Sequence, residues 1–225
     1  DWVPMGPETN PFTGTFDGEG HTINGLTNLC LFGYVGAGTT VRNIRFTNVS
    51  TILPPVAACV YGSVDAPTTF SGIEVNGMIS SDVISVSGLV GILRSTETGL
   101  PSSMKQSPEV IIENCTNNAS ASCVGYTRAA GFVVTVYGVS LEVRDCVNNG
   151  DLSVTNYTRE AHAGGIVGFV IHNSLLASEA GDARCNNFTV TVKNCINNGA
   201  VSGTVGISAN NFVGGIVAAA NNGRI

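Results

Sequence analysis

The segment FDGEGHTINGL, residues 16–26, brings two carboxylates and an imidazole, those of Asp17, Glu19 and His21, close together in the chain. Groups of these types can transfer protons or bind a metal ion. A catalytic acid and base need a cleft and a second group at a defined separation, and the sequence offers no matching second cluster. Asp17 can instead cap backbone N–H groups in a glycine-rich turn, and His21 can hydrogen-bond across the same corner. We therefore interpret the segment as a tight turn, and we predict no catalytic residue, metal or other cofactor.

Two short sequence patterns recur and indicate the elements that hold this turn. The first is a tetrad such as Gly88-Leu-Val-Gly, and the second is a tetrad that ends in Ile or Cys, such as VRNI ending at Ile44. The first pattern begins at Cys30, Cys59, Gly88, Gly131, Gly165 and Gly215. The second pattern ends at Ile44, Ile73, Cys115, Cys146 and Cys195. Self-similarity of this kind is the sequence signature of a repeat architecture.

The spacing of the two patterns is regular. The distance from the end of the second pattern to the start of the next first pattern is 15 to 20 residues. The return step, from the start of a first pattern to the end of the next second pattern, is 14 or 15 residues in three cases. In two cases the return step is 27 or 30 residues, because of insertions at about 94–109 and 172–187. The basic period is therefore about 29 residues, with the large insertions at one point of the cycle. Such a pattern is typical of a solenoid.

The composition of the repeat indicates which kind of solenoid it forms. Its segments are short, rich in Val, Ile, Phe and Thr, and interrupted by Gly, Asn and Ser, without a sustained helical period. Stretches such as VSLEVRDCV alternate apolar and polar residues, as half-buried strands do. We predict an all-β fold, a parallel β-helix (β-solenoid) of about six coils that forms one domain over residues 1–225. We expect this domain to be a fragment of a longer chain, with further coils or domains of that chain as partners.

The residues that end the second pattern form a predicted interior column. A position that alternates between Ile and Cys is apolar, and a free cysteine there behaves as a small hydrophobe. The predicted core ladder consists of Ile44, Ile73, Cys115, Cys146 and Cys195. Cys30 and Cys59 begin two successive tetrads, so we expect their backbones one strand spacing apart, within reach of a disulfide. Simple stacking of these two small residues is the alternative.

Composition and charge limit the functional classes. Charged residues are 12% of the chain, and Lys and Arg are too few and too scattered for a nucleic-acid footprint. No apolar run reaches the about 18 residues of a membrane span, so no transmembrane segment is expected. Sequons begin at Asn48, Asn114, Asn118, Asn156 and Asn187, which are candidate N-glycosylation sites. Roughly four sequons would arise by chance at this composition, so their number says little about the compartment.

The opening block and the tetrads also resemble a known family. W-x-P-x-G at Trp2 to Gly6, the block PFTGTFDGEGHTINGL and the Gly-Leu-Val-Gly series are similar to the GLUG-motif repeat proteins over nearly the whole chain. The chain departs from the family pattern at Cys30 and Cys59, where later repeats have Gly, and at Ala218. The resemblance implies a β-helix in an adhesin-like protein that is extracellular or on the cell surface. It supplies no catalytic residues.

Three functions remain open from the sequence. The working prediction is a non-catalytic structural or adhesive segment, whose loops on one edge of the β-helix contact glycans or surface proteins. The candidate contact residues are Arg94, Glu97, Lys105, Glu179 and Asp182. The alternatives are a polysaccharide lyase or hydrolase, which fold analogy alone supports, and an inert spacer domain of a surface protease or filament. His162, in TNYTREAHAGG, is expected in an exposed, solvated loop.

Overall fold

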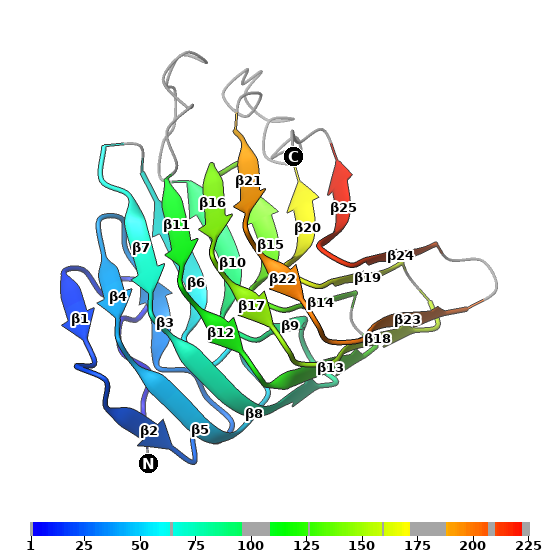
Figure 1. The fold of residues 1–225 in the computed structure, drawn as a ribbon, viewed down its shortest axis with the longest axis horizontal. Coiled ribbons are helices and arrows are strands. Elements are labelled where there is room, and N and C mark those ends of the chain that lie inside the picture. Colours follow the sequence, from blue (N-terminus) through cyan, green and yellow to red (C-terminus); the bar gives the residue numbers. More distant parts are fainter. Residues whose placement is uncertain are drawn as a thin grey trace.

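The computed structural model describes residues 2–63, 65–95, 109–125, 127–158, 160–171, 188–206 and 210–221. Over these residues the chain is all-β, without a helix, and every pairing between its strands is parallel (Figure 1). No helix that could cross a membrane occurs in this part of the chain. The arrangement is consistent with a β-helix or solenoid.

The strands form four sheets, which we name A to D. Sheet A contains β3 (Phe32–Val35), β6 (Ala57–Gly62), β10 (Val90–Ser95), β15 (Val133–Tyr137), β20 (Val167–Ile171) and β25 (Val217–Asn221). Sheet B contains β1 (Thr15–Asp17), β4 (Thr40–Arg42), β7 (Thr68–Ser71), β11 (Val110–Glu113), β16 (Leu141–Arg144) and β21 (Val190–Lys193). Sheet C contains β2 (Thr22–Asn24), β5 (Arg45–Thr51), β8 (Glu74–Ser81), β12 (Thr116–Asn117), β13 (Ser120–Val124), β17 (Val147–Asn148), β18 (Leu152–Asn156), β22 (Ile196–Asn197) and β23 (Val201–Val205). Sheet D contains β9 (Val86–Ser87), β14 (Arg128–Ala130), β19 (Ala161–Gly164) and β24 (Asn211–Gly214).

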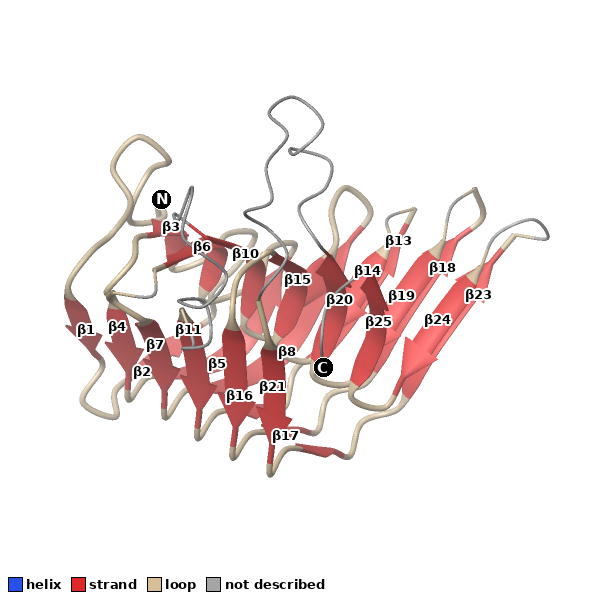
Figure 2. Cartoon of the chain, turned by 90° about the horizontal axis from the view of Figure 1, so that it is seen from above, coloured by secondary structure: helices blue, strands red, loops and turns tan. Residues whose placement is uncertain are grey.

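The chain visits these sheets in a fixed order, from B through C, and from β9 onward through D, to A and back to B. We call one such circuit a pass. Each strand pairs with the strand that the next pass contributes to the same sheet. Strands that are far apart in the sequence therefore lie side by side, as the row from β1 to β21 shows in Figure 2.

The interior is filled by rows of apolar side chains, one from each pass. In sheet B the register aligns Val41, Phe70, Ile112 and Val143, and all four are fully buried. Sheet A contributes an equivalent row of fully buried side chains, formed by Val60, Leu93, Val136 and Val170. Burial of such rows is the main stabilising contribution in a sheet of this kind, because the backbone hydrogen bonds largely replace bonds to water.

From the second pass onward, each pass turns from sheet B to sheet C at a single residue with a left-handed backbone. The φ angle there is +55° at Asn43, +61° at Gly72, +52° at Asn114, +54° at Asp145 and +52° at Asn194. Gly, Asn and Asp adopt this conformation at the least cost, which explains the residue types at this corner. The following residue in each case belongs to the predicted core ladder of Ile44, Ile73, Cys115, Cys146 and Cys195. The first four are buried and Cys195 is half-buried.

A steric constraint explains why the later tetrads begin with glycine. A Cβ atom at Gly88, Gly131 or Gly165 would lie 2.2, 2.9 or 2.6 Å from a side-chain amide carbon of the next pass. The amides belong to Asn117, Asn148 and Asn197 respectively. Because these asparagines are inward and at most half-exposed, they leave no room for a side chain at the tetrad position. The first glycine of these tetrads thus contacts the asparagine that lies two residues beyond the end of the second pattern in the next pass.

The tetrad predicted at Cys59 is wrong. The register of sheet A pairs Cys59 with Tyr34, which is four residues beyond Cys30. Pro55 occupies the position that corresponds to Cys30, and its carbonyl accepts the N–H of Leu31 at 2.8 Å. The argument for a disulfide between Cys30 and Cys59 therefore fails, and both thiols are free.

Candidate functional site

The opening turn is held together by Asp17. Its Oδ1 accepts hydrogen bonds from the backbone N–H of Glu19 and from Nδ2 of Asn43, each at 3.0 Å. Its Oδ2 accepts a hydrogen bond from Nε of Arg42 at 2.8 Å. The N–H of Glu19, and then the amide of Asn43 and the Arg42 guanidinium, lower the pKa of the Asp17 carboxyl. Asp17 is therefore a turn cap in ionised form, and His21 joins the turn through its backbone N–H.

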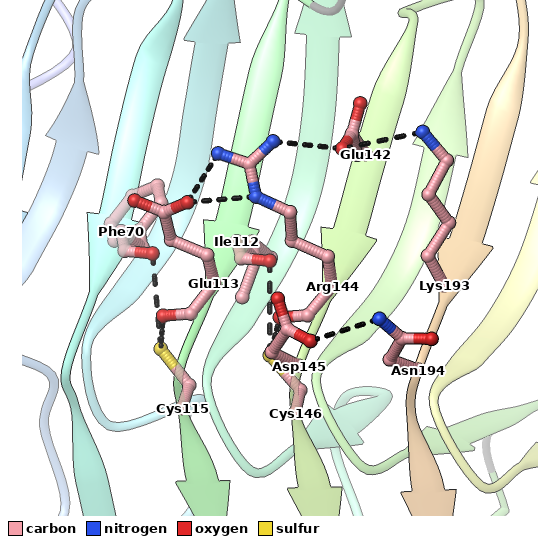
Figure 3. Close-up of polar contacts among 10 residues, drawn as sticks. All are labelled: Phe70, Ile112, Glu113, Cys115, Glu142, Arg144, Asp145, Cys146, Lys193 and Asn194. Atoms are coloured by element: carbon pink, nitrogen blue, oxygen red, sulfur yellow. Dashed lines mark hydrogen bonds and ion pairs between the residues drawn. The ribbon is translucent and has the colours of Figure 1, made fainter.

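A line of charged side chains crosses the outer face of sheet B over β11, β16 and β21 (Figure 3). Arg144 binds Glu113 of the preceding pass through two guanidinium nitrogens. It also binds Glu142 of its own strand at 2.9 Å, and Nζ of Lys193 lies 3.6 Å from the same carboxylate. The carboxylates of this line are thus bound to cations of their own sheet.

The thiols of Cys115 and Cys146 follow the same strands at the corner toward sheet C (Figure 3). Each thiol donates to a carbonyl of the preceding pass, Cys115 to Phe70 at 3.8 Å and Cys146 to Ile112 at 3.7 Å. The contact with Cys115, followed by burial, raises the pKa of the Cys146 thiol to about 12. A thiol that stays protonated at neutral pH acts as a packing group and not as a nucleophile.

Arg94 is the candidate contact residue that the structure describes. It is exposed on β10, where the register places it between Tyr61 of β6 and Tyr137 of β15. The other candidate contact residues, Glu97, Lys105, Glu179 and Asp182, lie outside the described residues, as does the sequon residue Asn187.

The remaining sequon asparagines differ in their setting. Asn48 and Asn114 are exposed, and Asn118 is half-buried. Asn156 is 1% exposed, and its Oδ1 accepts the backbone N–H of Thr158 at 3.0 Å. The folded structure does not support glycosylation at Asn156, because a buried amide cannot reach a glycosylating enzyme. At the other positions glycosylation stays a prediction.

A groove of about 410 Å³ opens on the outer face of sheet A. Its floor is formed by Cys59, Ile92 and Thr135, which the register aligns across β6, β10 and β15. The groove is also lined by the polar residues Glu8, Tyr34, Ser85, Arg94 and Arg128, and by Leu53, Pro54, Ala58, Ile84, Gly91 and Val134. The groove thus combines an apolar surface with two arginines, one carboxylate, hydroxyl groups and an aromatic ring, which is a composition suited to a small ligand that carries both apolar and polar groups.

Arg128, at the start of β14, is the most constrained charged side chain of the groove. Its Cζ lies 4.4 Å from the ring centroid of Phe169, and its Nη1 lies 3.4 Å from Oγ1 of Thr135. Its Nε is buried and has no hydrogen-bond partner among the described residues. Burial lowers the pKa of the Arg128 guanidinium, whereas Tyr137 and Glu160 act in the opposite direction. The guanidinium is held in place by packing, and its Nε has no hydrogen-bond partner in the described part of the chain.

His162 is 4% exposed on β19 and does not lie in an exposed loop, as the sequence had suggested. Its ring stacks on Phe212, with centroids 4.9 Å apart, and lies 4.6 Å from the ring of Phe169. The register of sheet D pairs it with Arg128. Burial, and then the Arg128 charge, lower the pKa of the His162 imidazole, whereas Glu160 raises it. The imidazole is therefore neutral at pH 7.

Sequence reasoning missed this groove because its lining comes from separate passes, with no local pattern. One signal was present in the tyrosines. Tyr34, Tyr61 and Tyr137, three of the five tyrosines of the chain, all belong to strands of sheet A. Tyr34 and Tyr61 lie on two successive passes, and aromatic side chains at the outer face of a sheet favour a binding surface over a core.

No protein-family model matches the chain, and no curated protein does. Among solved structures, the fold is similar to that of a putative immunoglobulin A1 protease from Bacteroides ovatus, with a TM-score of 0.64 and 19% sequence identity. The match covers 99% of this chain and 63% of the other, so this chain spans less than two thirds of the length of its structural neighbour. At this identity, the likeness shows that the two chains share a fold.

Proposed function

We propose that the chain is a non-catalytic structural and adhesive segment of a larger cell-surface or secreted protein. In this proposal the passes are the coils of one β-solenoid domain over residues 1–225, about six coils with a basic period of about 29 residues. Side-chain contacts between passes support it, since their partners are 25, 29 or 31 residues apart at Arg42, Arg45 and Arg144. The separations rise to 42 and 49 residues where the predicted insertions at 94–109 and 172–187 intervene.

The observation that carries the proposal is that charged side chains serve as links between passes. Arg45 binds Glu74 of the next pass at 2.8 Å, and Arg144 binds Glu113 of the preceding one. Glu109 is fully buried and accepts the backbone N–H of Ser140 at 2.8 Å. A catalytic carboxylate must reach its substrate as an acid, a base or a nucleophile, whereas these carboxylates are bound to groups of neighbouring passes. Exposed pairs of this kind contribute little stability, about 0–1 kcal/mol each, and they connect one pass to the next.

Two further findings support a larger parent protein outside the cell. The match to 63% of a putative immunoglobulin A1 protease fits a domain that is one part of a longer chain. The resemblance of the opening block and tetrads to GLUG-motif proteins favours an extracellular or cell-surface location. We propose further coils or domains of the same chain as partners, together with glycans or surface proteins.

A loop replacement tests the adhesive part of the proposal. Residues 95–107 are replaced by a Gly/Ser linker of equal length, and attachment of the purified chain to cells and to immobilised glycans is measured. Weaker attachment supports the adhesive function. Unchanged attachment at an unchanged unfolding midpoint places the contact surface outside this loop. Attachment of neither chain identifies an inert spacer of a surface protease or filament.

A turnover assay tests the non-catalytic part. The chain is incubated with a panel of acidic polysaccharides, and the products are separated by chromatography. We expect no product. Product release that is abolished by Glu8→Gln, which removes the carboxylate of the groove, would establish the alternative of a polysaccharide lyase or hydrolase.

A further inference from the structure

The geometry points to a binding site for an acidic glycan in the groove on the outer face of sheet A. The carboxylate of a uronic or sialic acid unit lies against Arg94 and Arg128, and its pyranose ring lies against Tyr34. The inference rests on the proposed adhesive function and names the chemical class of its ligand. It also moves the contact surface from the predicted loops to a sheet face.

The groove must recognise its ligand through side chains. Its floor consists of β6, β10 and β15, and each of these strands is paired on both sides within sheet A. Their backbone N–H and C=O groups are therefore already bonded, and a peptide cannot bind here by adding a strand. The volume of about 410 Å³ falls in the range of pockets that hold a small ligand, which is about 300–1,000 Å³.

The charge of the lining favours an anion. Two of its residues, Arg94 and Arg128, carry positive charge, and one, Glu8, carries negative charge. Phe169 and Thr135 hold the Arg128 guanidinium in place, and its buried Nε has no partner among the described residues. A guanidinium that is already fixed loses little conformational freedom when it binds a carboxylate. His162, which is neutral at pH 7, adds no opposing or supporting charge next to Arg128.

The remaining lining favours a sugar ring over an acidic peptide. Tyr34 lines the groove, and its ring is stacked with that of Tyr61, with centroids 6.4 Å apart and an interplanar angle of 19°. An aromatic face of this kind packs against the C–H face of a pyranose. The side chains of Tyr34 and Ser85 supply hydroxyl groups that can donate to and accept from sugar hydroxyls. A peptide would need backbone partners that the paired strands do not offer.

The test is calorimetric binding of the full chain to oligogalacturonate and sialyllactose, compared with uncharged lactose and with hexaglutamate. We expect both acidic sugars to bind, and lactose and hexaglutamate to bind at least tenfold more weakly. Arg128→Gln and Arg94→Gln should each lower affinity for the acidic sugars about tenfold, because each removes a charged hydrogen-bond donor. Tyr34→Ala should lower it about fivefold. The matched control is Arg45→Gln on sheet C, an exposed arginine paired with Glu74, which should leave binding unchanged.

Every outcome of this experiment decides something. Arg94 is exposed and Tyr34 half-buried, so their variants decide the question if Arg128→Gln does not fold. Equal affinity for lactose, or unchanged affinity in the Arg94→Gln and Tyr34→Ala variants, overturns the inference. Preference for hexaglutamate assigns the groove to an acidic peptide and also overturns it.

The same samples separate this inference from the proposed function. If the acidic sugar is bound and then cleaved, the assignment of the groove as a glycan site is supported and the non-catalytic function is wrong. If attachment to cells persists undiminished in the Arg94→Gln chain, the adhesive function stands and the groove assignment is wrong.

Discussion

Asn117 donates a hydrogen bond from its side-chain Nδ2 to Oδ1 of Asn148 at 2.7 Å, and Asn148 donates in the same way to Asn197 at 2.7 Å. Each of these amides also donates to a backbone carbonyl two residues further along the chain, at 3.0 Å. Both hydrogens of the Asn117 and Asn148 amides are therefore used. The stack links three successive passes from the inside of the fold.

We predict that Asn148→Ala lowers the free energy of unfolding by about 2–4 kcal/mol, because one N–H of the Asn117 amide and the carbonyl of Gly150 each lose their side-chain partner in the interior. The matched control is Asn149→Ala, an exposed neighbour, which should cost less than about 1 kcal/mol. Urea unfolding at equilibrium measures both. Equal losses for the two variants would contradict an interior role for the stack.

A second prediction concerns the tetrad glycines. Gly131→Ala should destabilise the chain by about 1–3 kcal/mol, because its Cβ would lie 2.1 Å from the carbonyl oxygen of Gly165 and 2.9 Å from Cγ of Asn148. Gly215→Ala is the control, since no described atom lies within 4 Å of a Cβ at that position. It should change stability by less than about 0.5 kcal/mol. Thermal unfolding of the two variants should separate them clearly, and a tolerated Gly131→Ala would show that the passes can move apart.

The third prediction concerns pH. Burial lowers the pKa of His162 in the folded chain, so the unfolded chain binds a proton more readily. The stability that neutral His162 supports is complete above its unfolded pKa of about 6.5, and it is lost as the pH falls toward the folded pKa. His162→Phe keeps the ring between Phe169 and Phe212 and should reduce the loss of stability between pH 7 and pH 5. Urea unfolding across this range is the measurement. A profile that is the same in both chains would show that His162 is not the titrating group.

The fourth prediction concerns the last described strand of each sheet. Ile196, Val213 and Ile216 are 53%, 45% and 36% exposed at this end, and β22, β24 and β25 are paired on one side within the described residues. Edges of this kind promote association between chains. We expect residues 1–225 to associate end to end with rising concentration. Light scattering after size-exclusion chromatography measures this.

Val213→Lys should weaken the association, because it places a charge on the apolar edge. Val124→Lys is the control, since Val124 is 53% exposed but lies on β13, which is paired on both sides. A monomer at every concentration would contradict this prediction.

The sequence predicted those parts of the fold that depend on the conformational preference of single residues. A left-handed corner needs Asn, Asp or Gly, so Asn114, Asp145 and Asn194 repeat before Cys115, Cys146 and Cys195. The register that aligns Ile112 with Val143 puts Cys115 and Cys146 on neighbouring passes, where the spacing had placed them. Short repeats of this kind can be read from one chain because the same local constraint applies in every pass.

The parts that the sequence did not predict depend on several passes at once. The letters CVYG at Cys59 match the tetrad pattern, yet the strand pairs four residues away from that alignment, because Pro55 and not Cys59 stands opposite Cys30. The groove depends on Arg128 lying near Thr135 and Phe169, which belong to two different passes. Burial of His162 likewise results from two aromatic rings on β20 and β24.

The asparagine stack has an outer counterpart that runs the other way. Asn198 donates to Asn149, Asn149 donates to Asn118, and Asn118 donates to Asn76, so this outer series points toward earlier passes while the inner one points toward later passes. Each amide carries a dipole along its hydrogen bond, so the dipoles of the inner and outer asparagine series, which point in opposite directions, largely cancel. These two series of amides therefore add little net dipole along the direction in which the passes stack. Adding a further pass with the same pair of asparagines would extend both series and leave their dipoles balanced.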